Sequence, residues 1–295
     1  MEMGLHGSAL MALAAAALWG GGDFSGGMGV KHAGGTMGAA LRVILLSHAV
    51  SLVALTLMAW WRGDAFPHGA ALAWGLGAGA TAGIALACFY VALSRGAMGA
   101  SAALSGLLAA GIPAAVSASA EGSPGLLRLV GFLVAGLAIW LIAAGPNPEA
   151  KAADRGTIWL AVVGGVGFGV YFVALKFAGS AGVIWPLATA RMGSLTVCTL
   201  LVAGMALKGN AGVAKVRLSR MVVAWALGAV LLDTSGNLLF IAATRAGRLD
   251  VAAVLASLYP ASTILLAAWT LHERPTRRQG LGMAVAAAAV VMITL

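Results

Sequence analysis

The sequence has very few charged residues, and this scarcity excludes most classes of protein. Only 9% of its 295 residues are charged and 61% are hydrophobic, whereas soluble globular domains carry about 25% charged residues. The composition therefore predicts an integral membrane protein.

Cysteine is also scarce, because the chain has only Cys88 and Cys198. Both lie within apolar runs, where a thiol behaves as a small hydrophobic group. We therefore expect neither a disulfide nor a metal site. The first apolar run is not preceded by a basic region, so no removable signal peptide is expected.

The basic residues are scattered over short segments and form no basic stripe. The net charge of +9 could suggest nucleic acid, but this distribution argues against it and favours a role in membrane topology. The loops after the first, third, fifth, seventh and ninth predicted helices hold eleven Lys and Arg, against five in the other loops. The positive-inside rule places the first set in the cytoplasm and both termini outside.

Ten apolar segments are long enough to cross about 30 Å of hydrocarbon as helices, which needs roughly 20 residues each. The predicted helices are 8–29, 36–60, 69–93, 98–120, 126–145, 156–177, 183–207, 221–244, 250–271 and 279–295. We expect Pro113 and Pro260 to interrupt two of them, either as plain kinks or at carbonyls that face a cavity.

The second half of the chain repeats the first. The residues from Phe89 to Arg95 match those from Phe240 to Arg245, and Glu121, Pro124 and Gly131 match Glu273, Pro275 and Gly282 after one extra residue. Two copies of one membrane unit are the sequence signature of a secondary transporter with its substrate between the repeats.

The polar stretch near the middle of the chain is the natural boundary between the halves. It divides the sequence into a first five-helix repeat at 1–145, a linker at 146–155 and a second five-helix repeat at 156–295. An odd number of helices in each repeat requires that the second copy be inverted relative to the first. The predicted fold is therefore an all-α integral membrane bundle of ten transmembrane helices in two inverted five-helix repeats.

Six motifs carry a family resemblance: residues 18–24 (Leu-Trp-Gly-Gly-Gly-Asp-Phe), Arg42, residues 171–176 (Tyr-Phe-Val-Ala-Leu-Lys), residues 255–260 (Leu-Ala-Ser-Leu-Tyr-Pro), residues 272–275 (His-Glu-Arg-Pro) and residues 279–282 (Gln-Gly-Leu-Gly). They resemble motifs of the drug/metabolite transporter superfamily, in particular its ten-helix EamA-type branch. The resemblance covers nearly the whole chain in two copies. It implies efflux of small metabolites, amino acids or drugs, without an ATP site, driven by an ion gradient or by exchange. That branch commonly has a cytoplasmic N-terminus, which the charge distribution here contradicts.

Four ionisable residues lie well inside predicted spans, where a charge costs at least a few kcal/mol unless it is paired or hydrated. Asp23 and Arg42 each lie about 10 Å beneath one membrane face and could pair. Arg191 and Asp233 lie deep on the opposite side and could also pair. Each arginine could alternatively serve only to lock two helices together. For the aspartates we favour a function in substrate binding and proton coupling, because neither has an acidic counterpart in the other repeat.

Side chains on the same helix faces extend these candidate sites. Trp19 shares a face with Asp23, a combination that suits an ammonium group, and Asn237 shares a face with Asp233. The aromatic residues near the centre provide further candidates, each of which could instead serve in packing: Trp19, Phe168, Tyr171, Phe172, Phe240 and Tyr259. His48 could relay protons or be a neutral histidine bonded to a helix carbonyl.

We therefore predict a monomeric, multi-pass transporter of the inner or plasma membrane, without a cofactor, that moves a small substrate by alternating access. The predicted substrate-binding residues are Trp19, Asp23, Arg42, Phe168, Tyr171, Arg191, Asp233, Asn237 and Tyr259, and the predicted proton-coupling residues are Asp23, Asp233 and His48. The predicted function is secondary-active export of small metabolites, foremost an amino acid or related zwitterion, which suits both signs of charge. A proton-coupled exporter of lipophilic cations is the alternative. An enzyme is not expected, because the sequence lacks His-Glu-x-x-His and serine–histidine motifs.

Overall fold

The protein is a bundle of helices, described by a computed structural model over residues 2–95, 98–143, 154–209, 218–270 and 276–295. Nine predicted segments each correspond to one helix, and the segment 250–271 is divided in two. The helices are α1 (Glu2–His32), α2 (Met37–Arg62), α3 (Gly69–Ser94), α4 (Met98–Ala120), α5 (Leu126–Ala143), α6 (Arg155–Ala178), the 3₁₀ turn η1 (Gly179–Ala181), α7 (Ile184–Leu207), α9 (Arg220–Ala246), α10 (Leu249–Ala256), α11 (Tyr259–Thr270) and α12 (Arg277–Thr294).

The two prolines that we expected to interrupt helices behave differently. Pro113 lies inside the continuous helix α4, whereas Pro260 is the second residue of α11, directly after the break at Ser257 and Leu258. Proline is tolerated in the first turn of a helix because the backbone N–H groups there have no intrahelical acceptor. The linker at 146–155 and the motif at 272–275 lie outside the described residues, apart from the last two positions of the linker.

Six helices are long and apolar enough to cross a membrane. Among the described residues these are Met37–Arg62, Gly69–Ser94, Ser101–Ala120, Arg155–Ala181, Ile184–Leu207 and Arg220–Ala246. Six of the ten predicted crossings therefore satisfy this criterion of length and hydropathy, and the other four stay predictions.

Polar side chains define where several helices begin. Thr36, Asp154 and Ser219 accept hydrogen bonds from backbone N–H groups in the first turns of α2, α6 and α9, and Thr276 forms a capping box with Gln279 at α12. These caps satisfy donors that have no partner within the helix. The hydrogen bonds from Thr157 lower the pKa of the Asp154 carboxyl below its ordinary value.

Glycines allow α3 and α7 to approach each other closely. A Cβ atom on Gly79 would lie 1.8 Å from the carbonyl oxygen of Ala190, and one on Gly193 would lie 2.1 Å from that of Leu76. Both distances are impossible for real atoms, so these positions require glycine. Such small residues allow close helix contact where burial of apolar surface from water cannot drive association.

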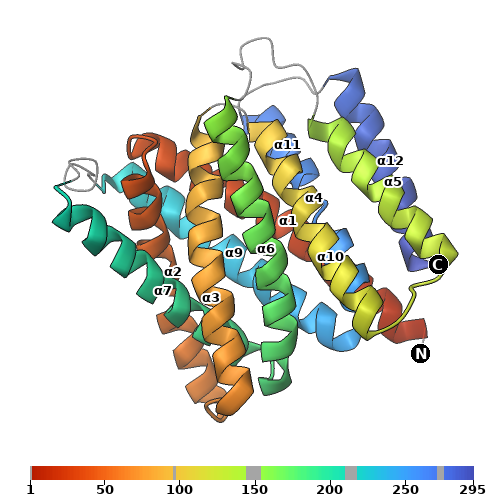
Figure 1. Ribbon diagram of the computed structural model, residues 1–295, viewed down its shortest axis with the longest axis horizontal. Coiled ribbons are helices and arrows are strands. Elements are labelled where there is room, and N and C mark those ends of the chain that lie inside the picture. The colour runs from red at the N-terminus through yellow and green to blue at the C-terminus, as the bar shows by residue number, and fades with distance from the viewer. Residues whose placement is uncertain (1, 96–97, 144–153, 210–217, 271–275) are drawn as a thin grey trace.

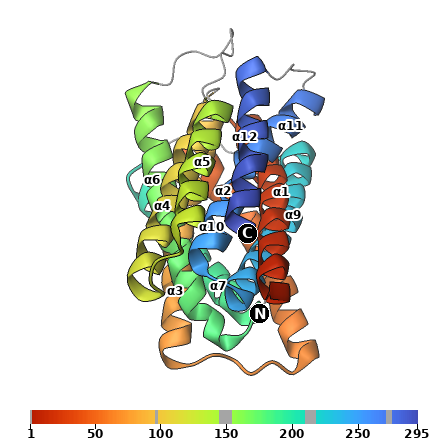
Figure 2. The ribbon, with the colours of Figure 1, turned by 90° about the vertical axis from the view of Figure 1, so that its right-hand side faces the viewer.

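The helices form two layers with a cavity between them. In Figure 1, α3, α4 and α6 lie toward the viewer and α1 and α9 lie behind them, while α5 and α12 form a pair at one side of the bundle. Figure 2 shows α12 beside α1 and α5. The packing follows the order of the two halves: α1 packs against α9 as α6 packs against α3, and α4 packs against α6 as α10 and α11 pack against α1.

A cluster of charges joins the two halves at one end of the bundle. Glu121, after the last residue of α4, lies 3.6 Å from the Lys176 ammonium of α6 and accepts a hydrogen bond from Ser117. Arg248, before α10, donates to the carbonyl oxygens of Glu121 and Gly122 and pairs at 2.8 Å with the buried carboxylate of Asp250. Three helices from both halves, α4, α6 and α10, are thereby linked at this end.

Candidate functional site

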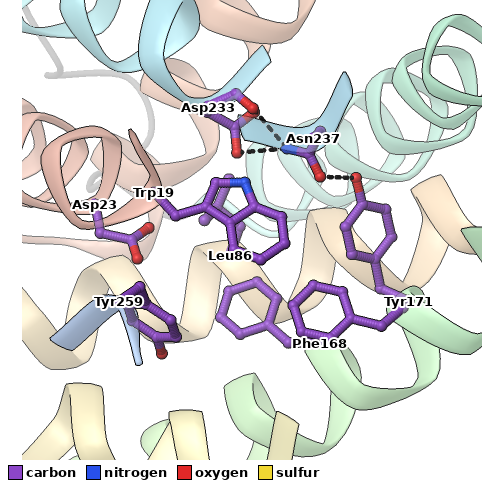
Figure 3. A pocket seen from close by; sticks show the side chains of 9 residues that line it. Trp19, Asp23, Leu86, Phe168, Tyr171, Asp233, Asn237 and Tyr259 are labelled. Carbon is purple, nitrogen blue, oxygen red and sulfur yellow. Dashed lines mark hydrogen bonds between the residues drawn. The ribbon is translucent and has the colours of Figure 1, made fainter. Parts of the chain in front are cut away.

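A cavity near the middle of the bundle is lined by aromatic rings and two carboxylates (Figure 3). Its lining residues come from α1, α3, α6, α9 and α11: Trp19, Asp23, Leu86, Phe168, Tyr171, Phe172, Asp233, Asn237 and Tyr259. The cavity volume is about 40 Å³, enough for a few water molecules. A substrate larger than this has to displace lining side chains.

Seven of the nine predicted substrate-binding residues line this one cavity. Arg191 does not line it but is bonded to Asp233, which does. Arg42 is also outside the described lining. Helices α2 and α7, which carry the predicted binding residues Arg42 and Arg191, therefore contribute no residue to the described lining.

The α1 side of the cavity consists of Trp19 and Asp23, one turn apart. The Trp19 indole is stacked on the Phe172 ring of α6 with 5.1 Å between centroids. The Asp23 carboxylate accepts no hydrogen bond and forms no ion pair within the described part of the chain, and in Figure 3 it lies on the side of Tyr259. A partly buried carboxylate without a cation in this setting is suited to an incoming ammonium group or a proton.

The α9 side of the cavity consists of Asp233 and Asn237, and both are held in place. The Asn237 amide donates to the backbone oxygen of Asp233 at 2.8 Å and to its Oδ1 at 2.9 Å. Tyr171 donates its hydroxyl proton to Asn237 Oδ1 at 2.7 Å. These hydrogen bonds link α6 to α9, and they fix the orientation of the Asn237 amide between the Tyr171 hydroxyl and the Asp233 carboxylate.

Arg191 completes this network behind the α9 side. Its side chain is 3% exposed and forms an ion pair with Asp233, while Nε donates to Ser51 Oγ at 3.1 Å. Ser51 in turn shares a hydrogen bond with Thr234 Oγ1 at 2.8 Å. The expected pairing of Arg191 with Asp233 is confirmed.

The hydrogen bonds of His48 define its protonation. Nη1 of Arg191 contacts His48 Nε2 at 3.0 Å, and a guanidinium can only donate, so Nε2 accepts. The ring proton then lies on Nδ1 and is donated to Ser194 Oγ at 2.8 Å. His48 is therefore a neutral imidazole that supports Arg191, bonded to side chains rather than to the helix carbonyl expected in the second interpretation.

The other expected pair does not form. No ion pair joins Asp23 and Arg42 among the described residues, although both belong to helices of the first half. The Nε atom of Arg42 is buried, and the residue interacts with other parts of the protein. The physical reason is that equal depth in the membrane does not place two side chains on facing surfaces of their helices.

The sequence interpretation missed Leu86 of α3 as a lining residue, together with Ser51 and Ser194 behind the lining. Leu86 is one of many aliphatic residues in an apolar helix, so no pattern distinguishes it. Ser51 and Ser194 share helices with His48 and Arg191, and their spacings of three residues in each helix were a usable signal. Phe172 was recognised as a central aromatic but not proposed to bind substrate.

Tyr259 reaches the cavity because a helix is broken beside it. It is the first residue of α11, and its hydroxyl donates to the Ala102 carbonyl of α4 at 3.1 Å. Phe89 lies edge-on to both Tyr259 and Phe168, with centroid separations of 6.2 and 5.4 Å. Cys88 and Cys198 are free thiols, and no group of three potential metal ligands occurs in the described ranges.

Comparison with known proteins finds a family match for the second half of the chain. Residues 155–295 match the EamA-like transporter family. A crystal structure with 16% sequence identity superposes over 97% of this chain and 95% of that chain with a TM-score of 0.71, which shows a shared fold. No curated protein matches the sequence.

Proposed function

Because residues 155–295 form an EamA-like transporter family domain within a multi-pass membrane protein, we propose that the chain is a secondary-active exporter of small ammonium-bearing metabolites. EamA-like proteins transport small molecules and are not enzymes. The substrate binds in the cavity between α1, α3, α6, α9 and α11, and the protein works as a monomer in the inner or plasma membrane by alternating access.

The proposal rests on one observation: the Asp23 carboxylate lines the cavity and has no cationic partner among the described residues. Two carboxylates line the cavity, and within the described part of the chain only Asp233 is paired with a cation. Aromatic rings occupy much of the remaining lining, and a ring face beside a carboxylate stabilises an ammonium group through cation–π attraction and charge pairing. Asp23 can hold either the substrate or a proton, so exchange of one for the other couples export to the proton gradient.

An amino acid, which suits both signs of charge in the sequence, is the second candidate. Its carboxylate needs a cation, but the described lining of the cavity includes no lysine, arginine or histidine. Arg191 lies behind Asp233 and is engaged with it. The geometry therefore favours substrates recognised by their amine over substrates recognised by both groups.

The paired packing of the helices supports an inverted-repeat arrangement. Exchange of the first and second halves converts the packing of α1 against α9 into that of α6 against α3. The residues of the cavity then come from both halves, as expected for a substrate site between two repeats.

Binding of a matched pair of ligands tests this proposal. We expect phenethylammonium to raise the unfolding temperature of the purified protein, and phenylalanine, which adds a carboxylate, to do so less. Asp23→Asn should remove the effect, and Asp64→Asn, a loop carboxylate change outside the cavity, should retain it. A response to phenylalanine alone, or an unaltered response in Asp23→Asn, would contradict ammonium recognition at Asp23.

Transport in liposomes tests the coupling. An imposed proton gradient should drive phenethylammonium against its concentration gradient in the unaltered protein and in Asp64→Asn. Asp23→Asn should show no such accumulation. Equal accumulation with and without the proton gradient would rule out proton exchange.

A further inference from the structure

Arg191 affects the cavity without being part of its surface. It is 3% exposed and its guanidinium contacts Asp233, His48 and Ser51. Of these partners only Asp233 lines the cavity. The guanidinium therefore compensates the charge of one lining residue, Asp233, although Arg191 itself is not part of the cavity surface.

The formal charges around the cavity can be counted from these contacts. The charged lining residues among those described are Asp23 and Asp233, both acidic. Arg191 compensates Asp233 through their ion pair. His48 accepts from the guanidinium and so contributes no charge of its own. One negative charge, that of Asp23, is left for a ligand.

We infer that Arg191 is a specificity-determining residue, which limits the cavity to substrates with a single positive charge by neutralising Asp233 from outside the lining. This inference rests on the proposed function, because it specifies the charge of the ammonium-bearing substrate. A dication would place its second charge near a carboxylate that is already compensated, and it would lose water without gaining a partner.

His48 and Ser51 act as positioning residues for this arrangement. They accept hydrogen bonds from two different nitrogen atoms of Arg191, at 3.0 and 3.1 Å. The planar guanidinium is thereby oriented so that its third nitrogen, Nη2, faces Asp233. The proton on His48 Nδ1, whose place follows from the Arg191 donation to Nε2, is donated to Ser194 Oγ.

Variants that change the charge count test the inference. The ligands are phenethylammonium and the dication that carries a second aminoethyl group at the para position of the same ring. In Arg191→Gln, Asp233 becomes available, so the affinity ratio of dication to monocation should rise at least about tenfold. In Arg191→Gln/Asp233→Asn, Asp23 is again the only charge, and the ratio should return to that of the unaltered protein.

Asp233→Asn provides a test in the opposite direction. It leaves the Arg191 charge uncompensated, so affinity for both cations should fall at least about tenfold. Asp64→Asn, a loop carboxylate change outside the cavity, is the control, and the ratio should stay unaltered. Because the double variant removes both charges of the pair together, it avoids an unpaired ion and keeps the test valid if Arg191→Gln does not fold.

The outcomes separate this inference from the proposed function. Monocation binding that is lost in Asp23→Asn, together with an affinity ratio that stays the same in Arg191→Gln, would overturn the role of Arg191 alone. If Arg191→Gln does not fold, the double variant Arg191→Gln/Asp233→Asn decides. Preference of that variant for the dication would also overturn the role of Arg191. Absence of Asp23-dependent binding of either cation in the unaltered protein would overturn the proposed function, and this inference with it.

Discussion

Asp23 and Asp233 line the same cavity but have opposite surroundings. Asp233, on α9, is bonded to Asn237 and Arg191, and the network continues to Tyr171 and His48. Asp23, on α1, has no such partner among the described residues. A carboxylate with its hydrogen bonds satisfied costs little to keep ionised, whereas one without partners is costly and is stabilised by a ligand or a proton.

The difference suggests a division of roles under the proposed function. The α9 side (Asp233 and Asn237) is preorganised by its hydrogen bonds, and the α1 side (Trp19 and Asp23) is the part that we propose responds to substrate. The two sides approach each other closely at Gly22 of α1, because a Cβ atom at this position would lie 3.3 Å from the backbone nitrogen of Asp233 on α9. A substrate bound at Asp23 therefore lies at a close contact between the two halves.

Asp23→Asn should have the largest effect on function and a small effect on stability. Loss of the charge removes a charge-assisted hydrogen bond to an ammonium group, so ligand affinity should fall roughly tenfold to a hundredfold. The free energy of unfolding should be unchanged or higher, because no partner is lost. Ligand titration and denaturation of the same preparation measure both. A clear loss of stability would mean that Asp23 has a structural role like that of Asp233.

Asp233→Asn should destabilise the fold more than Asp23→Asn does. It leaves the guanidinium of Arg191 buried without a counter-charge, which costs about 3 kcal/mol. Thermal unfolding in detergent, with Asp23→Asn as the reference, measures the difference. Equal unfolding temperatures for the two variants would remove the distinction between the two sides of the cavity.

Gly236→Ala tests the contact between the sides themselves. The new Cβ would lie 2.8 Å from Trp19 Cδ1, so the indole must move from its position on Phe172. Overpacking of this kind costs about 1–3 kcal/mol. Gly228→Ala on the same helix is the control, because its Cβ would meet Ser25 Oγ at an ordinary 3.6 Å. Identical ligand affinity and stability in the two variants would show that Trp19 is free to move.

Asp154→Ala should have the smallest effect and one that depends on pH. This carboxylate outside the cavity accepts a hydrogen bond from the Thr157 backbone at 2.6 Å, and its pKa is lowered. The cap therefore stabilises α6 fully above the ordinary pKa of aspartate, and the stabilisation is lost as pH falls through the lowered pKa. Unfolding temperatures of the protein and the variant should differ at neutral pH and converge in acid. Asp154→Ser, which retains a capping oxygen, should show a smaller difference at neutral pH.

Much of the site could be predicted from helix faces. Spacing along one helix predicted that Trp19 lies beside Asp23 and that Asn237 lies beside Asp233, and all four line the cavity. The relation between helices was harder to predict, since the Arg191 and Asp233 pair forms whereas Asp23 and Arg42 do not pair. Depth in a membrane gives one coordinate of a side chain, and the rotation of each helix about its axis is a second coordinate that depends on packing.

The sequence by itself determined that the chain is helical, where nearly every helix begins and ends, and which polar residues share a helix face. Hydrophobic length, capping residues and the helical period are local properties, so they can be read along the chain. Only the tertiary structure decided that Arg191 lies behind Asp233 and that Asp23 faces the cavity without a cation among the described residues. These features depend on how closely glycines allow helices from the two halves to approach, and that distance is set by contacts between residues far apart in sequence.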